Sequence, residues 1–146
     1  MVNIISIDPG RDKCGLLVAD VHRKIVVEAK VVKAYAVLEL VNRWSTKYLP
    51  EKIIIGNGTT SKDWYLSIKE NNIDSIEFVE EKNTTMRSKD RYFDICPPSL
   101  LIRWLPRSLI LPPKNLDSVA ALILVEDYFD IKLEWHGSIS LKTWPE

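Results

Sequence analysis

The sequence predicts an α/β domain built on a mixed five-stranded sheet with helices on its faces. Three apolar segments with short connections, 2–7, 15–19 and 25–32, open the chain and predict an antiparallel meander. Two further apolar segments, 52–56 and 76–80, each follow a helical pattern, as parallel strands joined by helices do. The right-handed crossover rule places the fourth strand beside the first. The expected order is therefore 3-2-1-4-5, with strand 2 antiparallel.

The helices are predicted from periodicity and composition. In the first, Val37, Val41 and Trp44 share one face, and Pro50 ends the helix. The last is apolar on nearly every face and should be buried. The proline-rich residues 94–113 are expected to form an irregular crossing loop whose apolar side chains need burial. The expected helices are 34–48, 62–71, 86–93 and 115–128.

Composition is that of an ordinary globular domain. The 146 residues are 46% hydrophobic and 27% charged, and we expect one domain over 1–130 with a C-terminal tail over 131–146. Twenty basic and twenty acidic residues cancel, which excludes a global basic field for nucleic acid. Cys14 and Cys96 are too far apart for a metal motif and predict reduced thiols in a cytoplasmic protein. No signal peptide or apolar run of membrane-spanning length is visible.

The first strand ends in Asp8-Pro9-Gly10, a turn that would hold a carboxylate rigidly at the sheet edge. Glycine there permits positive backbone dihedrals and the close approach of a charged ligand. A simple hairpin turn is the alternative, because these are turn residues in any case. The fourth strand ends at Gly56 and the fifth at Glu81. Ligands of such sheets gather at the carboxyl ends of parallel strands, so these three tips should lie together.

Three segments carry a resemblance to known proteins: Ile7-Asp-Pro-Gly-Arg-Asp-Lys-Cys-Gly15, Glu80-Glu-Lys-Asn-Thr-Thr85 and Leu116-Asp-Ser-Val-Ala-Ala-Leu-Ile-Leu124. Together and in this order they resemble the ribonuclease-H-like superfamily, and within it the YqgF-like family related to the Holliday-junction resolvase RuvC. The chain departs from the family at Lys13, where an Arg is usual, and at Glu80, where an Asp is usual. RuvC has a further Asp where this chain has Lys114.

The resemblance implies a two-metal nuclease site whose catalytic and metal-binding residues are Asp8, Glu81 and Asp117. Mg²⁺, with Mn²⁺ as a substitute, would be held by oxygen ligands alone. Asp8 would bridge both ions. Two alternatives stay open: Asp117 could serve the positive N-terminal end of its helix, and strand alternation does not choose between Glu80 and Glu81, which only the family match does.

Nucleic-acid contacts are expected from polar and basic residues around these acids, although a solvated basic helix face is the alternative. The candidates are Arg11, Lys13, Asn57, Lys82, Thr84, Thr85, Arg87, Lys89, Arg91, Arg103 and Arg107.

The sequence and the resemblance together favour a metal-dependent endonuclease acting on branched DNA or structured RNA, without a membrane partner. A homodimer would suit four-way junctions, which need two symmetric cuts. The family also implies maturation of the small-subunit ribosomal RNA. A non-catalytic nucleic-acid-binding module is the second hypothesis, because the segment Ile55-Gly-Asn-Gly-Thr59 resembles the YqgF-type domain of the transcription accessory protein Tex. An ATPase of the sugar-kinase and actin type is third, because 146 residues supply only one of its two lobes.

Overall fold

The structure is a computed structural model. It describes residues 2–58, 66, 68, 75–81, 84–99, 101–106, 109–111, 115–137, 139 and 142–146. The expected helix 62–71 lies outside the described residues except at positions 66 and 68, which are helical. No helix in the described part of the chain combines the length and the apolar character needed to span a membrane.

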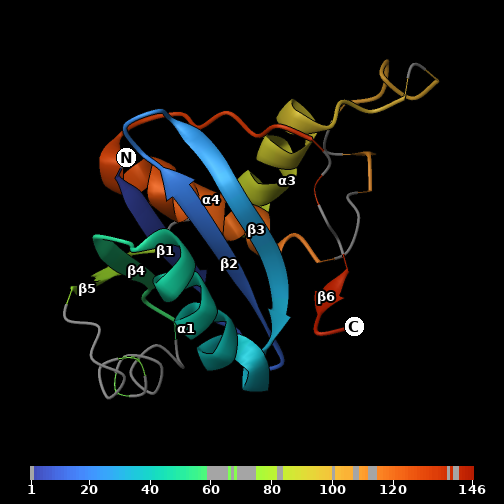
Figure 1. Cartoon of the computed structure of the whole chain (residues 1–146). Coiled ribbons are helices and arrows are strands. Elements are labelled where there is room, and N and C mark those ends of the chain that lie inside the picture. Colours follow the sequence, from blue (N-terminus) through green and yellow to red (C-terminus); the bar gives the residue numbers. More distant parts are fainter. Residues whose placement is uncertain are drawn as a thin grey trace.

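A six-stranded sheet forms the centre of the molecule, in the order β5-β4-β1-β2-β3-β6 (Figure 1). β1 pairs antiparallel with β2 and parallel with β4, and β4 pairs parallel with β5. The predicted order 3-2-1-4-5 is therefore confirmed. The tail adds a short strand, β6, parallel to β3. The strands are β1 Asn3–Asp8, β2 Lys13–Asp20, β3 Ile25–Lys33, β4 Lys52–Gly56, β5 Ile76–Val79 and β6 Thr143–Trp144.

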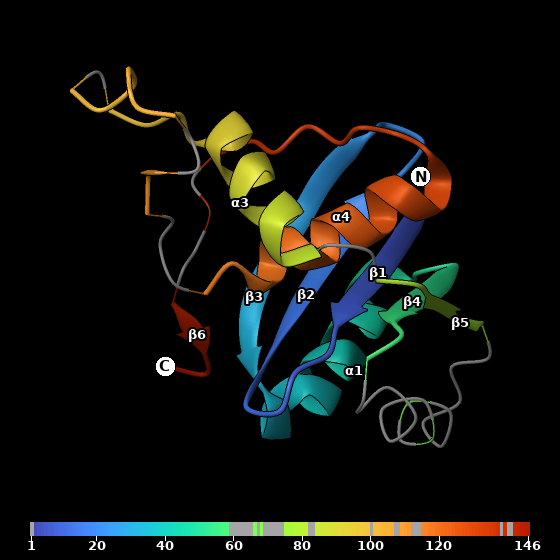
Figure 2. The same cartoon turned by 180° about the vertical axis from the view of Figure 1, so that it is seen from behind.

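Helices cover both faces of the sheet. One face carries α1, and the opposite face carries α4 with α3 packed beside it (Figures 1 and 2). A short 3-10 helix, η1 (Ala34–Ala36), connects β3 to α1. The described helices are α1 Val37–Tyr48, α3 Thr84–Ile95 and α4 Asp117–Phe129.

Strand alternation divides the core into two layers. On the α1 side, Ile5 and Ile7 of β1 pack with Trp44 of the helix. On the other side, Ile4 packs with Leu122 of α4, and the Ser6 hydroxyl donates a 2.8 Å hydrogen bond to the Ala121 carbonyl. Because α4 lies between sheet and α3, all residues from Ser118 to Val125 are buried, as its apolar sequence predicted. Alternation continues to Asp8, whose side chain lies on the α4 face.

Regular alternation of side chains does not hold in the first half of β3. Strict alternation would place Ile25, Val27, Ala29 and Val31 on one face, but the pairing with β2 shifts between Val18 and Ala19. Val27 is left without a partner on β2 and is 40% exposed. Such a bulge inserts one residue and reverses the facing of everything before it. Val26 and Ala29 consequently pack against the same core layer.

The loop after α3 also differs from expectation. Residues 101–106 contain consecutive turns, with hydrogen bonds from Ile102 to Ser99 and from Leu105 to Ile102. We expected its apolar side chains to be buried, but Leu101 and Trp104 are 84% and 78% exposed. The loop projects from the body of the molecule (Figure 1).

Candidate functional site

The carboxyl ends of β1, β4 and β5 meet at one edge of the sheet, because the three strands are parallel neighbours. Asp8 ends β1 and stands beside Gly56, which ends β4. Glu81 follows β5 by two residues. Asp117 begins α4, which packs against β1 and β2 on the face that Asp8 occupies. The fold thus brings the three predicted acids to one corner of the α4 face.

Glu81 lies directly over the end of β4. A Cβ added to Gly56 would stand 2.1 Å from Glu81 Oε1, so the carboxylate occupies the space that a side chain at position 56 would need. Glu80 is exposed. Of the two glutamates that the sequence left open, Glu81 is therefore the one that reaches Asp8.

Asp8 and Glu81 form a half-buried acid pair. Burial, a side-chain hydrogen bond with Glu81 and the charges of Glu81 and Asp117 together raise the pKa of Asp8 to about 8. At neutral pH the Asp8–Glu81 pair consequently retains one proton. Glu81 Oε1 is buried and has no hydrogen-bond partner among the described residues. A buried carboxylate oxygen without a donor is costly, and a cation would relieve that cost.

Asp117 completes the corner. Burial raises its pKa, while a hydrogen bond from its own backbone amide and the charge of Lys13 oppose that rise. The Lys13 Nζ donates a 2.7 Å hydrogen bond to Asn115 Oδ1, two residues before Asp117. Since Asp117 is the first residue of α4, the favourable field of the helix N-terminus acts on it as well.

The donor set suits a hard divalent cation. Asp8, Glu81 and Asp117 offer only carboxylate oxygens, and Glu81 Oε1 has no competing partner. Within the described residues, however, no group of three or more His, Cys, Asp or Glu side chains is already arranged around a metal position. The three carboxylates are therefore close to one another but are not already arranged as a metal-binding site.

The turn from Asp8 to Lys13 is shaped by a different constraint from the one we expected. Gly10 does not adopt a positive φ, the only described glycine that does being Gly137. A Cβ on Gly10 would instead lie 2.2 Å from the Lys13 carbonyl oxygen, so the turn closes too tightly for a side chain. The Gly10 amide donates to Cys14 Sγ at 3.4 Å. Burial raises the pKa of the Cys14 thiol to about 11, which keeps it protonated.

The predicted nucleic-acid contacts fall into two groups. Arg11, Lys13 and Asn57 are exposed and lie in the turns that follow β1 and β4. Arg87 and Arg91 lie elsewhere: Arg87 forms a two-pronged ion pair with Asp127, and Arg91 pairs with Glu126 at 2.9 Å. Both partners are near the carboxyl end of α4. Nine helical steps from Asp117 to Glu126 span about 14 Å, so these arginines do not lie beside Asp117.

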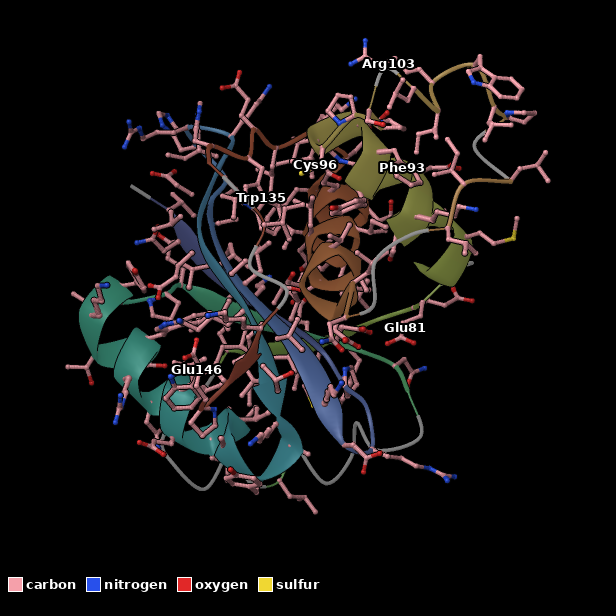
Figure 3. The ribbon with its side chains drawn as sticks, turned by 90° about the vertical axis from the view of Figure 1, so that its right-hand side faces the viewer. Glu81, Phe93, Cys96, Arg103, Trp135 and Glu146 are labelled. Carbon is pink, nitrogen blue, oxygen red and sulfur yellow. The ribbon has the colours of Figure 1, made fainter. Side chains whose placement is uncertain are left out.

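The other predicted contacts are more distant or undescribed. Arg103 is exposed on the projecting loop, and Figure 3 shows it at the far end of the molecule from Glu81. Lys89 lies half-buried on α3. Lys82, Arg107 and the side chains of Thr84 and Thr85 lie outside the described residues, as does Lys114.

Comparison with known proteins identifies the fold. No family model and no curated protein matches the sequence. Among solved structures, the chain is similar to T. thermophilus RuvC in complex with Holliday junction substrate, with a TM-score of 0.52 and 15% identity. The match covers 89% of this chain and 95% of that chain. The fold is ribonuclease-H-like.

Two glycines beside the acids were missed as positioning residues. A Cβ on Gly15 would lie 1.8 Å from the Asp117 carbonyl oxygen, just as one on Gly56 would meet Glu81. Gly15 is the strand partner of Asp8, and Gly56 lies on its other side. The sequence showed glycines gathered at strand tips, which suggested backbone freedom. Their role is instead to leave room on both sides of Asp8 for the two other acids.

Proposed function

We propose that this protein is a divalent-metal-dependent endonuclease that hydrolyses phosphodiester bonds in branched nucleic acid. The observation that carries the proposal is the half-buried Asp8–Glu81 pair at the carboxyl edge of three parallel strands, with one buried carboxylate oxygen that has no hydrogen-bond partner among the described residues. Such an arrangement is unfavourable for stability, and perturbed carboxylates of this kind cluster at functional sites.

Asp8, Glu81 and Asp117 would hold Mg²⁺ or Mn²⁺. A divalent cation bound there would supply an activated water and neutralise charge that develops on the phosphate. The protein's own contribution is placement: Gly56 and Gly15 let the carboxylates approach Asp8, and α4 presents Asp117 from the opposite side. Binding requires Asp8 to release its proton, so metal affinity should rise with pH through the pKa of Asp8.

Nucleic acid is the substrate class that best fits the surroundings. Arg11 and Lys13 closely follow the Asp8 tip, are exposed and provide cations for phosphates near the cleaved bond. The shared fold with RuvC, described in complex with a Holliday junction substrate, favours branched DNA. The resemblance to the YqgF-like family favours a precursor of the small-subunit ribosomal RNA as the second substrate. We propose a homodimer for junction cleavage, since two symmetric cuts need two centres.

The decisive experiment measures cleavage by the purified protein in Mg²⁺, Mn²⁺ and Ca²⁺, with four-way-junction DNA and precursor RNA side by side. We expect cleavage in Mg²⁺ or Mn²⁺, and a loss of at least 100-fold in Asp8→Asn and Glu81→Gln. Glu80→Gln is the matched control, because Glu80 is the exposed neighbour, and it should retain activity. Equal activity in Asp8→Asn and the parent would overturn the catalytic assignment.

A non-catalytic nucleic-acid-binding module is the second candidate. It is favoured by the finding that no three acids within the described residues are already arranged around a metal position. In that case junction DNA would bind with the same affinity with and without Mg²⁺, and neither substrate would be cut. Asp8→Asn would then bind nucleic acid at least as well as the parent, since it removes a negative charge.

A further inference from the structure

A basic pocket lies beside the acidic corner, by which we mean Asp8, Glu81 and Asp117. It is at the start of β2 and the end of β3. Its volume is about 470 Å³, and its lining residues are Arg11, Asp12, Lys13, Lys33, Ala34, Tyr35 and Thr143. The turn after β1 forms one wall, where the Ala34 amide donates to the Asp12 carbonyl at 2.8 Å. β6 forms another, since Thr143 pairs with Val31. The volume lies in the range of small-ligand sites.

The pocket's charges favour an anion. Three of its side chains are cationic, and Asp12 is the one carboxylate. Lys13 and Lys33 are direct cross-strand partners, and like charges in that position are destabilising. Lys13 bonds to the neutral amide of Asn115, and within the described residues neither Arg11 nor Lys33 forms an ion pair. A bound phosphate would relieve the Lys13–Lys33 repulsion.

The pocket continues the acidic corner along the same edge of the sheet. Gly15 faces Asp117 and Cys14 faces the α1 core, so Lys13 and its partner Lys33 lie on the α4 face with Asp8. Four charged residues follow one another across this edge of the sheet. Glu81 lies over the end of β4, Asp8 is on β1, Lys13 on β2 and Lys33 on β3. Lys33 lies two strand spacings from Asp8 and two residues beyond its register, so the two positions are about 12 Å apart, or about three to four nucleotides at the 3.4 Å rise of a stacked strand.

Tyr35 also lines the pocket, and phosphate binding alone does not explain an aromatic ring there. The residue is 77% exposed, although it is only the second residue after β3. An exposed aromatic ring beside cations is the usual platform for an unpaired base, because every base has a face for stacking. Bases inside a duplex are already stacked on their neighbours and cannot use it.

We infer that this pocket holds an unpaired nucleotide a few positions from the cleaved bond, its phosphate on Lys33 and Arg11 and its base on Tyr35. The inference rests on the proposed function for its account of the acidic corner, and it names the substrate class: strands that leave their duplex at a branch. Neither Lys33 nor Tyr35 carried any role in the sequence analysis.

The test is a binding measurement in Ca²⁺, without cleavage, by fluorescence anisotropy. Two DNAs are compared, one fully paired and one with a single-stranded tail. Tyr35→Ala should weaken binding of the tailed DNA about tenfold and that of the duplex less than twofold, and Tyr35→Phe should restore it. Lys33→Gln should reduce the log–log salt slope by about 0.7 to 0.9. Lys47→Gln, an exposed lysine at the opposite end of α1, is the matched control.

Every result of this binding experiment either supports or contradicts the role of the pocket. Four results would contradict the inference that this pocket binds an unpaired nucleotide. They are an equal loss of affinity for the two DNAs in Tyr35→Ala, no loss in that variant, an unchanged salt slope in Lys33→Gln, and no binding by the parent protein. Loss in Trp104→Ala instead of Tyr35→Ala would place the stacking surface on the projecting loop and would also overturn it. If the parent binds tailed DNA through Tyr35 but cuts nothing in Mg²⁺ or Mn²⁺, the proposed nuclease function fails while the pocket stands.

Discussion

The Glu81 carboxylate occupies the space where a side chain on Gly56 would be: a Cβ at Gly56 would lie 2.1 Å from Glu81 Oε1. This contact joins the end of β4 to the segment after β5 and directs Glu81 at Asp8. Glycine at position 56 is therefore a requirement of the acid pair, and the relationship can be tested independently of the acids themselves.

Gly56→Ala should displace Glu81 with little effect on folding, because the atom it meets is the far end of a flexible side chain. A misplacement of about 1 Å can cost about 100-fold in rate, and we expect a loss of that order in cleavage. Gly58→Ala is the matched control, since its Cβ would meet nothing closer than 3.5 Å. Comparable activity in the two variants would contradict the positioning role of Gly56.

Gly15→Ala should act on stability instead. Its Cβ would lie 1.8 Å from the Asp117 carbonyl oxygen and 2.9 Å from the Ser118 nitrogen, and both are backbone atoms that cannot turn aside. α4 must shift away from β2, so we expect a loss of about 3 kcal/mol or more in unfolding free energy. Urea denaturation of both glycine variants measures the contrast, and a smaller loss for Gly15→Ala than for Gly56→Ala would contradict it.

The metal-free protein should become less stable as pH rises from about 4 to about 8. The pKa of Asp8 is raised from 3.8 to about 8 in the folded state, so the folded protein binds more protons in that window. The stabilisation that protonated Asp8 provides is fully present below about pH 4. It is lost as the pH rises towards about 8, by up to about 1.4 kcal/mol per pH unit. Denaturation in EDTA at several pH values measures it. Asp8→Asn should flatten the profile, and an equally steep one would exclude Asp8 as its source.

Mg²⁺ should raise the melting temperature of the parent protein and not that of Asp8→Asn. A ligand that binds only the folded state stabilises it in proportion to the logarithm of its concentration. The proton that Asp8 carries must leave, so binding should release protons into a weakly buffered solution at pH 7. Scanning calorimetry and a proton-release assay give two readouts besides cleavage, and equal stabilisation of both proteins would place the metal elsewhere.

Arg91→Ala should destabilise the fold. Both partners of the Arg91–Glu126 ion pair are 12% exposed, and Arg91 also donates to the Leu133 carbonyl at 2.7 Å. Removing one partner leaves a nearly buried charge, at a cost of about 3 kcal/mol. Arg43→Ala breaks an exposed pair on α1 and should cost about 0.5 kcal/mol or less. If Arg91→Ala instead weakens nucleic-acid binding at unchanged stability, its role is in the interface.

The sequence by itself determined the strand order and the edge of the sheet at which Asp8, Gly56 and Glu81 meet, whereas Asp117 was named only by the resemblance. Strand periodicity, short connections and the handedness of crossovers are local or general constraints, and they are sufficient to place parallel strand tips together. The same periodicity failed at Val27, because a bulge depends on the partner strand and leaves no mark in its own segment.

Only the tertiary structure decided which glutamate reaches Asp8, why Gly15 and Gly56 flank it, and where the basic residues lie. Arg91 follows Glu81 closely in sequence, yet α3 carries it to the carboxyl end of α4, where Glu126 binds it. Lys33 is remote from Asp8 in sequence, yet pairing of β3 with β2 brings it to the same edge. Space and charge at a site depend on atoms contributed by several elements, and no single segment of sequence records them.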